Sequence, residues 1–279
     1  MADYLEAYAK RFELPVRTGV RVDGLSRNED RYVIRSGDRN FEADHVVVAT
    51  GANQTPKVPS FSRDLDPSIV QLHSYAYQGP SDLKDGSVLV VGVGNSGAEI
   101  ALEVARTHQT WLSGKPSGQI PVRHGPAAAR FMFPVVRFMG HHVLTLGTPI
   151  GRTLGPKLES GAAPLIRVKL KDLAAAGVQQ VARTAGTKDG LPVLHDGRVL
   201  DVSNVIWCTG FRYDFGWIDL PVIGEHGAPL HRRGIVEGEP GLYFMGLVLQ
   251  YAVSSDVLPG MSRDAAYIAK HIASRASNR

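Results

Sequence analysis

The sequence predicts an α/β protein in which a Rossmann-like dinucleotide-binding unit is inserted into another α/β domain. Two observations carry this prediction. The stretch Ser87–Arg106 has the pattern of a buried strand, a glycine-rich turn and a helix, in that order. An apolar strand that ends in Thr-Gly occurs before this stretch, at Thr50-Gly51, and again after it, at Thr209-Gly210. The chain is therefore expected to leave one domain, build the dinucleotide unit and return.

The composition is that of an ordinary globular protein. Of the 279 residues, 43% are hydrophobic and 21% are charged, which suits one large or two modest domains. Lys and Arg number 31 against 27 Asp and Glu, and so small an excess gives no indication of a nucleic-acid partner. Cys208 is the one cysteine, which excludes an internal disulfide and fits a reducing, cytoplasmic compartment. No run approaches the roughly 20 apolar residues of a membrane span.

The region before the dinucleotide unit is expected to form one helix and several strands. Tyr4–Phe12 carries apolar residues on one side, and Pro15 ends this helix. Strands are expected at Val16–Leu25, at Arg31–Ile34, from Phe41, and, buried and ending in small residues, over Asp44–Gly51.

The glycine-rich turn has the residues that a dinucleotide pyrophosphate needs. Gly92 allows the tight turn, Gly94 lets the backbone approach a phosphate, and Gly97 lets the helix lie close to the strand. Asn95 and Ser96 complete the turn at the helix start, where unpaired N–H groups and the helix dipole attract phosphate. The alternative is a glycine turn that serves only strand-to-helix packing.

The end of the next strand distinguishes NAD from NADP. NAD-binding folds place an acid about 20 residues after the turn, for the ribose 2′-hydroxyl. Here the strand Thr110–Leu112 is followed by Ser113, Gly114 and Lys115, without Asp or Glu. A hydroxyl and a cation suit a 2′-phosphate, so the sequence favours NADP(H). The alternative is that Lys115 is one more solvated surface lysine.

The segment Gly125–Gly151 is rich in Phe, Met and Val and carries Arg130 and Arg137. One or two packed helices are expected, and the alternative is a lid or partner surface, since exposed apolar area usually marks an interaction. The pair His141-His142 has no Cys, Asp or Glu cluster beside it, and adjacent residues point in different directions, so no metal site is expected.

Further elements complete the pattern. A buried strand is expected at Gly241–Gly246, and a terminal helix over Ser262–Ala276 with Ser262 as its N-cap. The strands expected in the inserted unit are Val88–Val91, Thr110–Leu112, Val178–Val181 and Val199–Val205.

Five motifs in this order resemble the class B flavoprotein monooxygenases, in particular the small bacterial flavin-containing monooxygenase type. They are Ala49–Gly51, Leu72-His73-Ser74 with Tyr77, Gly92–Ala101, Trp207–Arg212 and Gly241–Gly246. The resemblance covers nearly the whole chain. It implies an FAD domain interrupted by an NADP domain, with residues 1–84 and 207–279 in the first and residues 85–206 in the second.

The resemblance also implies an NADPH- and FAD-dependent enzyme. In that family NADPH reduces FAD, and the reduced flavin oxygenates a small organic substrate with O2 through a flavin hydroperoxide. The resemblance places Thr50, Gly51, Thr209 and Gly210 around the flavin. No catalytic nucleophile or acid–base pair is needed, because the flavin performs the chemistry.

Two features depart from the family pattern. In the signature FxGxxxHxxx(Y/F/W), His73 and Tyr77 match, whereas Pro67 and Ile69 stand at the Phe and Gly positions. Family members begin with a strand, a GxGxxG turn and a helix that hold the FAD pyrophosphate, and this sequence has one GxGxxG, of the NADPH type. The expectation is a truncated chain with an incomplete FAD domain, which binds NADPH but purifies without FAD. The strand that Val46–Val48 and Val205–Trp207 would pair with is then missing too.

Two other classes stay open. A flavin-dependent disulfide reductase relative should carry CxxC, which this sequence lacks, and a non-catalytic NADP-binding protein would show no flavin absorbance. His73 is an acid/base candidate by residue type, but it is expected to cap a loop or fill a structural site. Cys208 is expected to be a buried small residue rather than a redox thiol. Asn53 and Gln54 are expected to face the flavin where flavin is bound.

Overall fold

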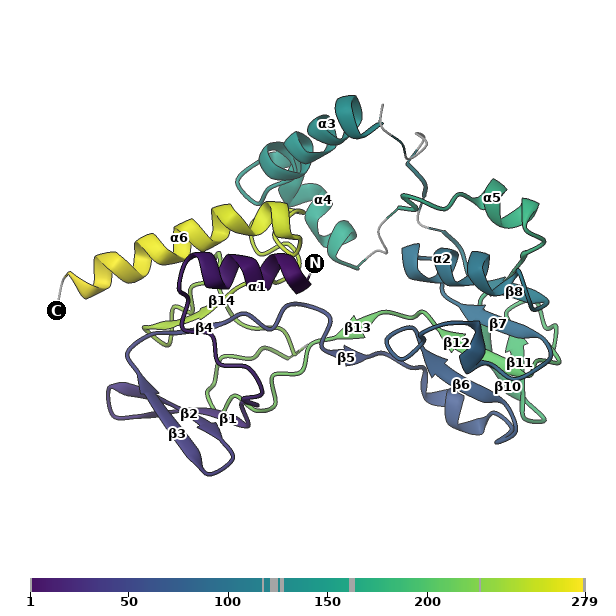
Figure 1. Ribbon diagram of the computed structural model, residues 1–279, viewed down its shortest axis with the longest axis horizontal. Coiled ribbons are helices and arrows are strands. Elements are labelled where there is room, and N and C mark those ends of the chain that lie inside the picture. Colours follow the sequence, from purple (N-terminus) through teal and green to yellow (C-terminus); the bar gives the residue numbers. More distant parts are fainter. Residues whose placement is uncertain are drawn as a thin grey trace. The chain divides into compact units, whose positions relative to one another are not determined.

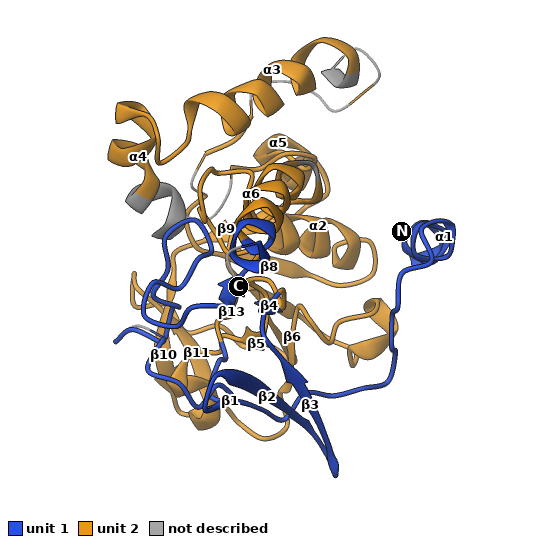
Figure 2. Ribbon diagram, turned by 90° about the vertical axis from the view of Figure 1, so that its left-hand side faces the viewer, with its two compact units in different colours: residues 1–48, 214–244, 272–279 blue, residues 49–213, 245–271 orange. Residues whose placement is uncertain are grey.

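The computed structural model describes residues 2–116, 118–120, 125, 128–160, 164–225 and 227–277. The chain forms two compact units, each assembled from segments that are distant in the sequence (Figure 2). Unit 1 comprises residues 1–48, 214–244 and 272–279, and unit 2 comprises residues 49–213 and 245–271.

Unit 2 is built on a five-stranded parallel sheet with the strand order β6-β12-β7-β8-β9. The mixed α/β architecture with a parallel sheet confirms the expected fold class. The sheet strands are β6 (Val70–His73), β7 (Val88–Val91), β8 (Thr110–Ser113), β9 (Gln179–Val181) and β12 (Asn204–Trp207). The helices α2 (Asn95–Val104) and α5 (Leu170–Ala175) lie beside this sheet (Figure 1) and belong to the same unit (Figure 2).

The strands β7 and β12 are buried along their whole length because both faces of the sheet are covered. Val88, Val90 and Ile206 pack with residues of α2 and α5 on one face. Leu89 and Trp207 pack on the other face, with Leu65 after the residue 60–64 turn and with Leu194 at the end of the strand Leu191–Leu194. Successive residues of a strand point to opposite faces of the sheet. One continuous apolar run therefore supplies side chains to the hydrophobic clusters on both faces.

Two expectations about β12 are wrong. The strand begins at Asn204 rather than at Val199, and it pairs with β6 and β7 inside this sheet, not with a strand of a flavin domain. β6 lies in the same sheet although it precedes residue 85. The expected boundaries between the FAD and NADP domains, after residue 84 and after residue 206, both fall within the span of this sheet. The limits of the two cofactor domains stay a prediction.

Two small antiparallel pairs complete the strands of unit 2. β5 (Thr55–Pro56) pairs with β13 (Phe211–Arg212), and this ribbon follows both Thr-Gly elements. β10 (Thr184–Lys188) pairs with β11 (Leu191–Leu194) directly after β9. Short 3-10 helices occupy Ser60–Asp64 (η1) and Pro80–Asp82 (η2).

The segment between β8 and α5 is helical where the structure describes it. Its elements are η3 (Ala128–Met132), α3 (Phe133–Phe138), η4 (Met139–Val143) and α4 (Pro149–Ser160), where η3 and η4 are wide π-type turns. The helices expected over Gly125–Gly151 are thus present within the described part of that range. Pro134 lies in the first turn of α3, where its missing N–H costs nothing.

Unit 1 contains an antiparallel sheet of β1 (Gly24–Asn28), β2 (Arg31–Ser36) and β3 (Arg39–Ala43), and a parallel pair of β4 (Val46–Val48) with β14 (Leu242–Phe244). α1 (Ala2–Arg11) confirms the first expected helix. The strand expected at Val16–Leu25 is wrong, because regular pairing begins only at Gly24. β4 is only partly buried, since the side chain of Val47 is 41% exposed.

The terminal helix α6 (Leu258–Ala276) is longer than expected. It begins four residues before Ser262, so the expected N-cap at Ser262 is wrong. Among the described residues, no helix has the length and apolar character needed to cross a membrane.

Candidate dinucleotide site

A pocket of about 960 Å³ lies at the carboxyl ends of the parallel strands of unit 2. Its wall is formed by residues that follow β7, β8, β9 and β12, together with residues of the loop between β4 and η1. Open α/β sheets bind ligands at this edge, where the order of the strands reverses. The reversal here lies between β7 and β12. After β7 the chain adds β8 and β9 on one side of β7, and it then places β12 on the other side of β7. The volume is at the upper end of the range for ligand pockets, about 300–1,000 Å³.

The three glycines of the turn have different surroundings. A Cβ on Gly92, whose φ is +112°, would lie 2.3 Å from the carbonyl oxygen of Cys208, and a Cβ on Gly97 would lie 1.9 Å from the carbonyl oxygen of Gly92. A Cβ on Gly94 would meet no described atom within 4 Å. Protein backbone therefore fills the space at Gly92 and Gly97, whereas Gly94 faces open space in the pocket wall. This geometry fits the three roles that the sequence predicts.

The start of α2 presents polar groups to this pocket. Gly94 is the N-cap residue, and no side chain caps the helix, so the first N–H groups have no intrahelical acceptor. The hydroxyl of Ser96 lies in the pocket wall and makes no hydrogen bond within the described part of the chain. Asn95 differs, because its Oδ1 accepts from Ile166 N at 2.8 Å and its Nδ2 donates to Pro164 O at 3.2 Å. The side chain of Asn95 thus holds a loop, and only its backbone is open to a ligand.

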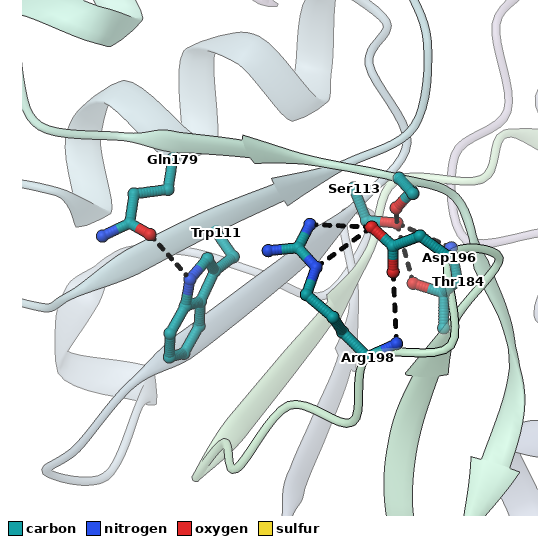
Figure 3. Close-up of polar contacts among 7 residues, drawn as sticks. Trp111, Ser113, Gln179, Thr184, Asp196 and Arg198 are labelled. Atoms are coloured by element: carbon teal, nitrogen blue, oxygen red, sulfur yellow. Dashed lines mark hydrogen bonds and ion pairs between the residues drawn. The ribbon is translucent and has the colours of Figure 1, made fainter.

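Ser113 does not offer its hydroxyl to a ligand. Its side chain is 1% exposed, its Oγ donates to Ala182 O at 3.0 Å, and it accepts from Thr184 N at 2.8 Å (Figure 3). The hydroxyl of Thr184 lies 2.8 Å away as a further partner. A second contact joins β8 to β9, because Trp111 Nε1 donates to Gln179 Oε1 at 3.2 Å (Figure 3). The expected contact of Ser113 with a 2′-phosphate is therefore corrected to a role in tying β8 to the segment after β9.

We expect Ser113→Ala to lower the free energy of unfolding by about 1–3 kcal/mol, because it leaves the Thr184 N–H without an acceptor in a partly buried site. Urea titration monitored by circular dichroism measures this change. The control Trp111→Phe removes an exposed hydrogen bond between β8 and β9, and it should lower the free energy of unfolding by less. A Ser113→Ala protein that keeps its stability but loses a preference for NADPH would restore the role in 2′-phosphate binding.

Two cations line the pocket at the ends of neighbouring strands. Lys115 follows β8 and Arg183 follows β9, and both side chains are exposed. Neither side chain has an ion-pair or hydrogen-bond partner within the described residues. The sequence analysis identified Lys115 and missed Arg183. The sequence could have indicated Arg183, because this cation stands two residues after the expected strand Val178–Val181. Lys115 likewise stands two residues after the end of β8.

The two Thr-Gly elements differ in their relation to the pocket. Thr209 and Gly210 line it, and they are fixed by the loop that contains Lys57. The hydroxyl of Thr209 donates to the carbonyl oxygen of Lys57, and Lys57 N donates to Gly210 O at 2.9 Å. This pairing continues the β5–β13 ribbon.

Thr50 and Gly51 do not line this pocket. Gln54 Nε2 donates to Thr50 Oγ1 at 3.0 Å and to Gly51 O at 2.8 Å, so this side chain closes its own turn. Asn53 is the residue of this loop that reaches the pocket wall. That Asn53 faces flavin stays a prediction, whereas the amide of Gln54 is engaged within its own turn.

His73 has a structural role, as the sequence analysis expects. Its ring is 8% exposed, its Nδ1 accepts from Tyr75 N at 3.1 Å, and its Nε2 lies 3.1 Å from Gly210 O. Because Nδ1 accepts, the proton is on Nε2, which donates to that carbonyl. Burial lowers the pKa of His73, so the ring is held neutral.

Cys208 lies in the pocket wall beneath the glycine turn. Burial raises the pKa of its thiol to about 12, while a hydrogen bond with Ser74 acts in the opposite direction. At neutral pH the group is a thiol and a poor nucleophile, which agrees with a buried small residue rather than a redox centre.

Known proteins resemble this chain over nearly its full length. A family model described as pyridine nucleotide-disulphide oxidoreductase matches residues 1–114. An oxidoreductase of Geobacillus kaustophilus, described as CzcO-like, is 35% identical over 98% of this chain and 77% of that protein. A probable indole-3-pyruvate monooxygenase of Arabidopsis thaliana, YUCCA3, is 28% identical over 98% of this chain and 69% of that protein. The chain belongs to the CzcO-like oxidoreductase family. It is also similar to flavin-containing monooxygenases.

A solved structure shows the same fold for this CzcO-like oxidoreductase. A mutant flavin monooxygenase from Stenotrophomonas maltophilia matches with a TM-score of 0.72 and 24% identity, over 98% of this chain and 76% of that one. The resemblance inferred from the five motifs is thereby confirmed, as is oxidoreductase membership. The family implies flavin and pyridine nucleotide as cofactors.

Proposed function

We propose that the protein is an NADPH-dependent oxidoreductase of the monooxygenase type, with NADPH bound in the pocket at the β7–β12 edge. The observation that carries the proposal is the open backbone at Gly94 together with the uncapped start of α2. A pyrophosphate placed there would accept hydrogen bonds from the free N–H groups and would gain from the helix dipole. The hydroxyl of Ser96 would provide a further donor.

The side of the pocket that holds Lys115 and Arg183 suits the adenosine half of the cofactor. Two cations without protein partners among the described residues can both reach a 2′-phosphate, which carries the charge that distinguishes NADPH from NADH. The nicotinamide half would then extend across the turn to the opposite side. There it would meet Thr209, Gly210 and Asn53.

The residues present fit flavin only in part. Gly51 and Gly210 have φ values of +72° and +80°, and a Cβ on either would meet no described atom within 4 Å, so both backbones are open to a flat group. Among the described residues, however, β7 and α2 form the one strand–glycine turn–helix unit that could hold a pyrophosphate. In this family flavin supplies hydride acceptance and oxygen transfer from O2 to a small organic substrate. We assign no residue of this chain to the flavin phosphates.

The nicotinamide preference tests the proposal. We expect NADPH to bind more tightly than NADH. Lys115→Ala and Arg183→Ala should each reduce the difference in binding free energy between the two nucleotides by about 1–3 kcal/mol, the scale of a charge-assisted contact. Titration of nucleotide fluorescence measures the NADPH and NADH affinities of each protein. Lys188→Ala is the matched control, because this lysine is a cation of the neighbouring β10 and does not line the pocket. Equal affinities for NADPH and NADH in the unsubstituted chain would refute the assignment.

A non-catalytic NADP-binding protein is the second candidate, favoured by the single pyrophosphate cradle of the described residues. The absorbance spectrum separates the two candidates. The 279-residue chain is expected to bind NADPH and to purify without stoichiometric FAD. A yellow protein that oxidises NADPH would show that other groups hold the flavin, and would favour the enzyme.

A further inference from the structure

The helical segment between β8 and α5 exposes an apolar surface that the other described residues of unit 2 do not cover. Phe131 is 71% exposed and Phe138 58%, and further apolar side chains are exposed along α3, η4 and α4. Six of the exposed apolar residues of this segment are Phe131, Val135, Phe138, Met139, Ile150 and Leu154. We call these six residues, together with the arginines between them, the 130–154 surface. They account for a large share of the exposed apolar side chains of unit 2.

The opposite side of this segment is held by the rest of unit 2. The guanidinium of Arg263 on α6 donates to the carbonyl oxygen of His141, and Ser254 Oγ donates to Gly140 O at 3.4 Å. Thr145 forms a bridge with Ala252, and a Cβ on Gly151 would lie 2.0 Å from Thr145 O. Side-chain donors of Arg263 and Ser254 and the Thr145–Ala252 bridge thus hold this segment through its backbone. None of these contacts uses an apolar side chain of the 130–154 surface.

The charged side chains of residues 104–158 are all basic. The sequence contains no Asp or Glu between Glu103 and Glu159, although the whole chain has 27 acids. Arg130, Arg137 and Arg152 are all exposed within the 130–154 surface. The guanidinium of Arg130 lies 5.9 Å from the ring centroid of Phe131, so cation and aromatic ring are side by side.

Helix α1 shows why the charge matters. It also exposes apolar side chains, with Tyr4 at 65% and Tyr8 at 48%, but it carries Asp3 and Glu6 among them. Exposed apolar side chains therefore occur both on α1 and on the 130–154 surface, and of these two places only the 130–154 surface lacks acids. A partner of the 130–154 surface must offer both an apolar phase and negative charge.

We propose that the 130–154 surface docks on an anionic phospholipid bilayer. The Phe, Met and aliphatic side chains would enter the boundary between headgroups and acyl chains, and the arginines would pair with lipid phosphates. Arginine suits this position because its aliphatic stem lies along apolar surface while its charged end reaches the headgroups. An acidic protein surface fits less well, because six bulky apolar side chains outnumber the three arginines. This inference is independent of the proposed nicotinamide chemistry.

The test is cosedimentation of the full 279-residue chain with vesicles. We expect binding to vesicles of phosphatidylcholine mixed with phosphatidylserine, and little binding to phosphatidylcholine alone. Binding should weaken when salt is raised from about 0.1 M to about 1 M, where the Debye length falls from about 10 Å to about 3 Å. Arg130→Gln combined with Arg137→Gln should weaken binding about fivefold per arginine. Phe131→Ser combined with Phe138→Ser should weaken it about tenfold or more.

The control is Tyr4→Ser combined with Tyr8→Ser on α1, which removes as many exposed aromatic rings and should leave vesicle binding unchanged. Far-UV circular dichroism verifies that each variant is folded. Four outcomes would overturn the proposal: no binding to phosphatidylserine vesicles, equal losses in the α1 control, equally tight binding to polyglutamate, or a dimer that the Phe variants convert to monomer. The third would indicate an acidic protein partner, and the fourth a second copy of this chain.

Discussion

Gly94→Val is expected to abolish NADPH binding in a protein that stays folded. The valine side chain would project into the open space where the pyrophosphate approaches, and we expect the affinity to fall by at least about 100-fold, or roughly 3 kcal/mol. The fold should tolerate the change, because Gly94 has φ −90° and ψ −174°, an extended conformation that valine readily adopts. Nucleotide titration and urea unfolding of the same preparation measure the two quantities.

Gly186→Val is the matched control for this substitution. A Cβ at Gly186 also meets no described atom within 4 Å, but this residue lies in β10 and outside the pocket wall. It should therefore leave NADPH affinity unchanged. If Gly94→Val bound NADPH as tightly as the unsubstituted chain, the glycine turn would serve packing alone and the site would have to be sought elsewhere.

Gly97→Ala is expected to be the most destabilising single methyl group in this region. Its Cβ would lie 1.9 Å from the carbonyl oxygen of Gly92, and relief requires α2 to move away from the end of β7. Overpacking against backbone in a closely packed site costs about 1–3 kcal/mol and occasionally more, and here we expect the upper end of that range. Thermal and urea unfolding measure the loss.

Gly94→Ala is the natural comparison, because it adds the same methyl group three residues earlier where the space is open. We expect it to change stability by less than about 1 kcal/mol. Similar losses for the two alanine variants would contradict the view that Gly97 is required by contact with the turn. The pair separates the packing role of the motif from its binding role within a single helix start.

The strand–turn–helix unit could be predicted because its signals are local. The apolar run of β7, the spacing of Gly92, Gly94 and Gly97, and the small residues of α2 lie within twenty consecutive residues. Each role of a glycine depends on atoms close along the chain or on a strand end, so sequence spacing is sufficient. The same holds for Lys115, which follows the next strand directly.

The features that the sequence analysis missed depend on residues far along the chain. The partners of the Ser113 hydroxyl are Ala182 and Thr184, which no spacing near residue 113 reveals. β12 pairs with β6 and β7, and an apolar run predicts a buried strand without indicating which strands it pairs with. The strand expected from Val16 was wrong because alternation of apolar residues is not sufficient without a partner strand, and pairing begins only at Gly24.

The place of β12 in the sheet has a consequence for synthesis of the protein on the ribosome. The strand that fills the gap between β6 and β7 emerges roughly 110 residues after β7, which is on the order of ten seconds at typical translation rates. During that interval the apolar strand Val88–Val91 keeps one hydrogen-bonding edge without its final neighbour. Chains released early would share this open edge, so ribosome stalling before residue 204 should yield aggregation-prone products that occupy chaperones.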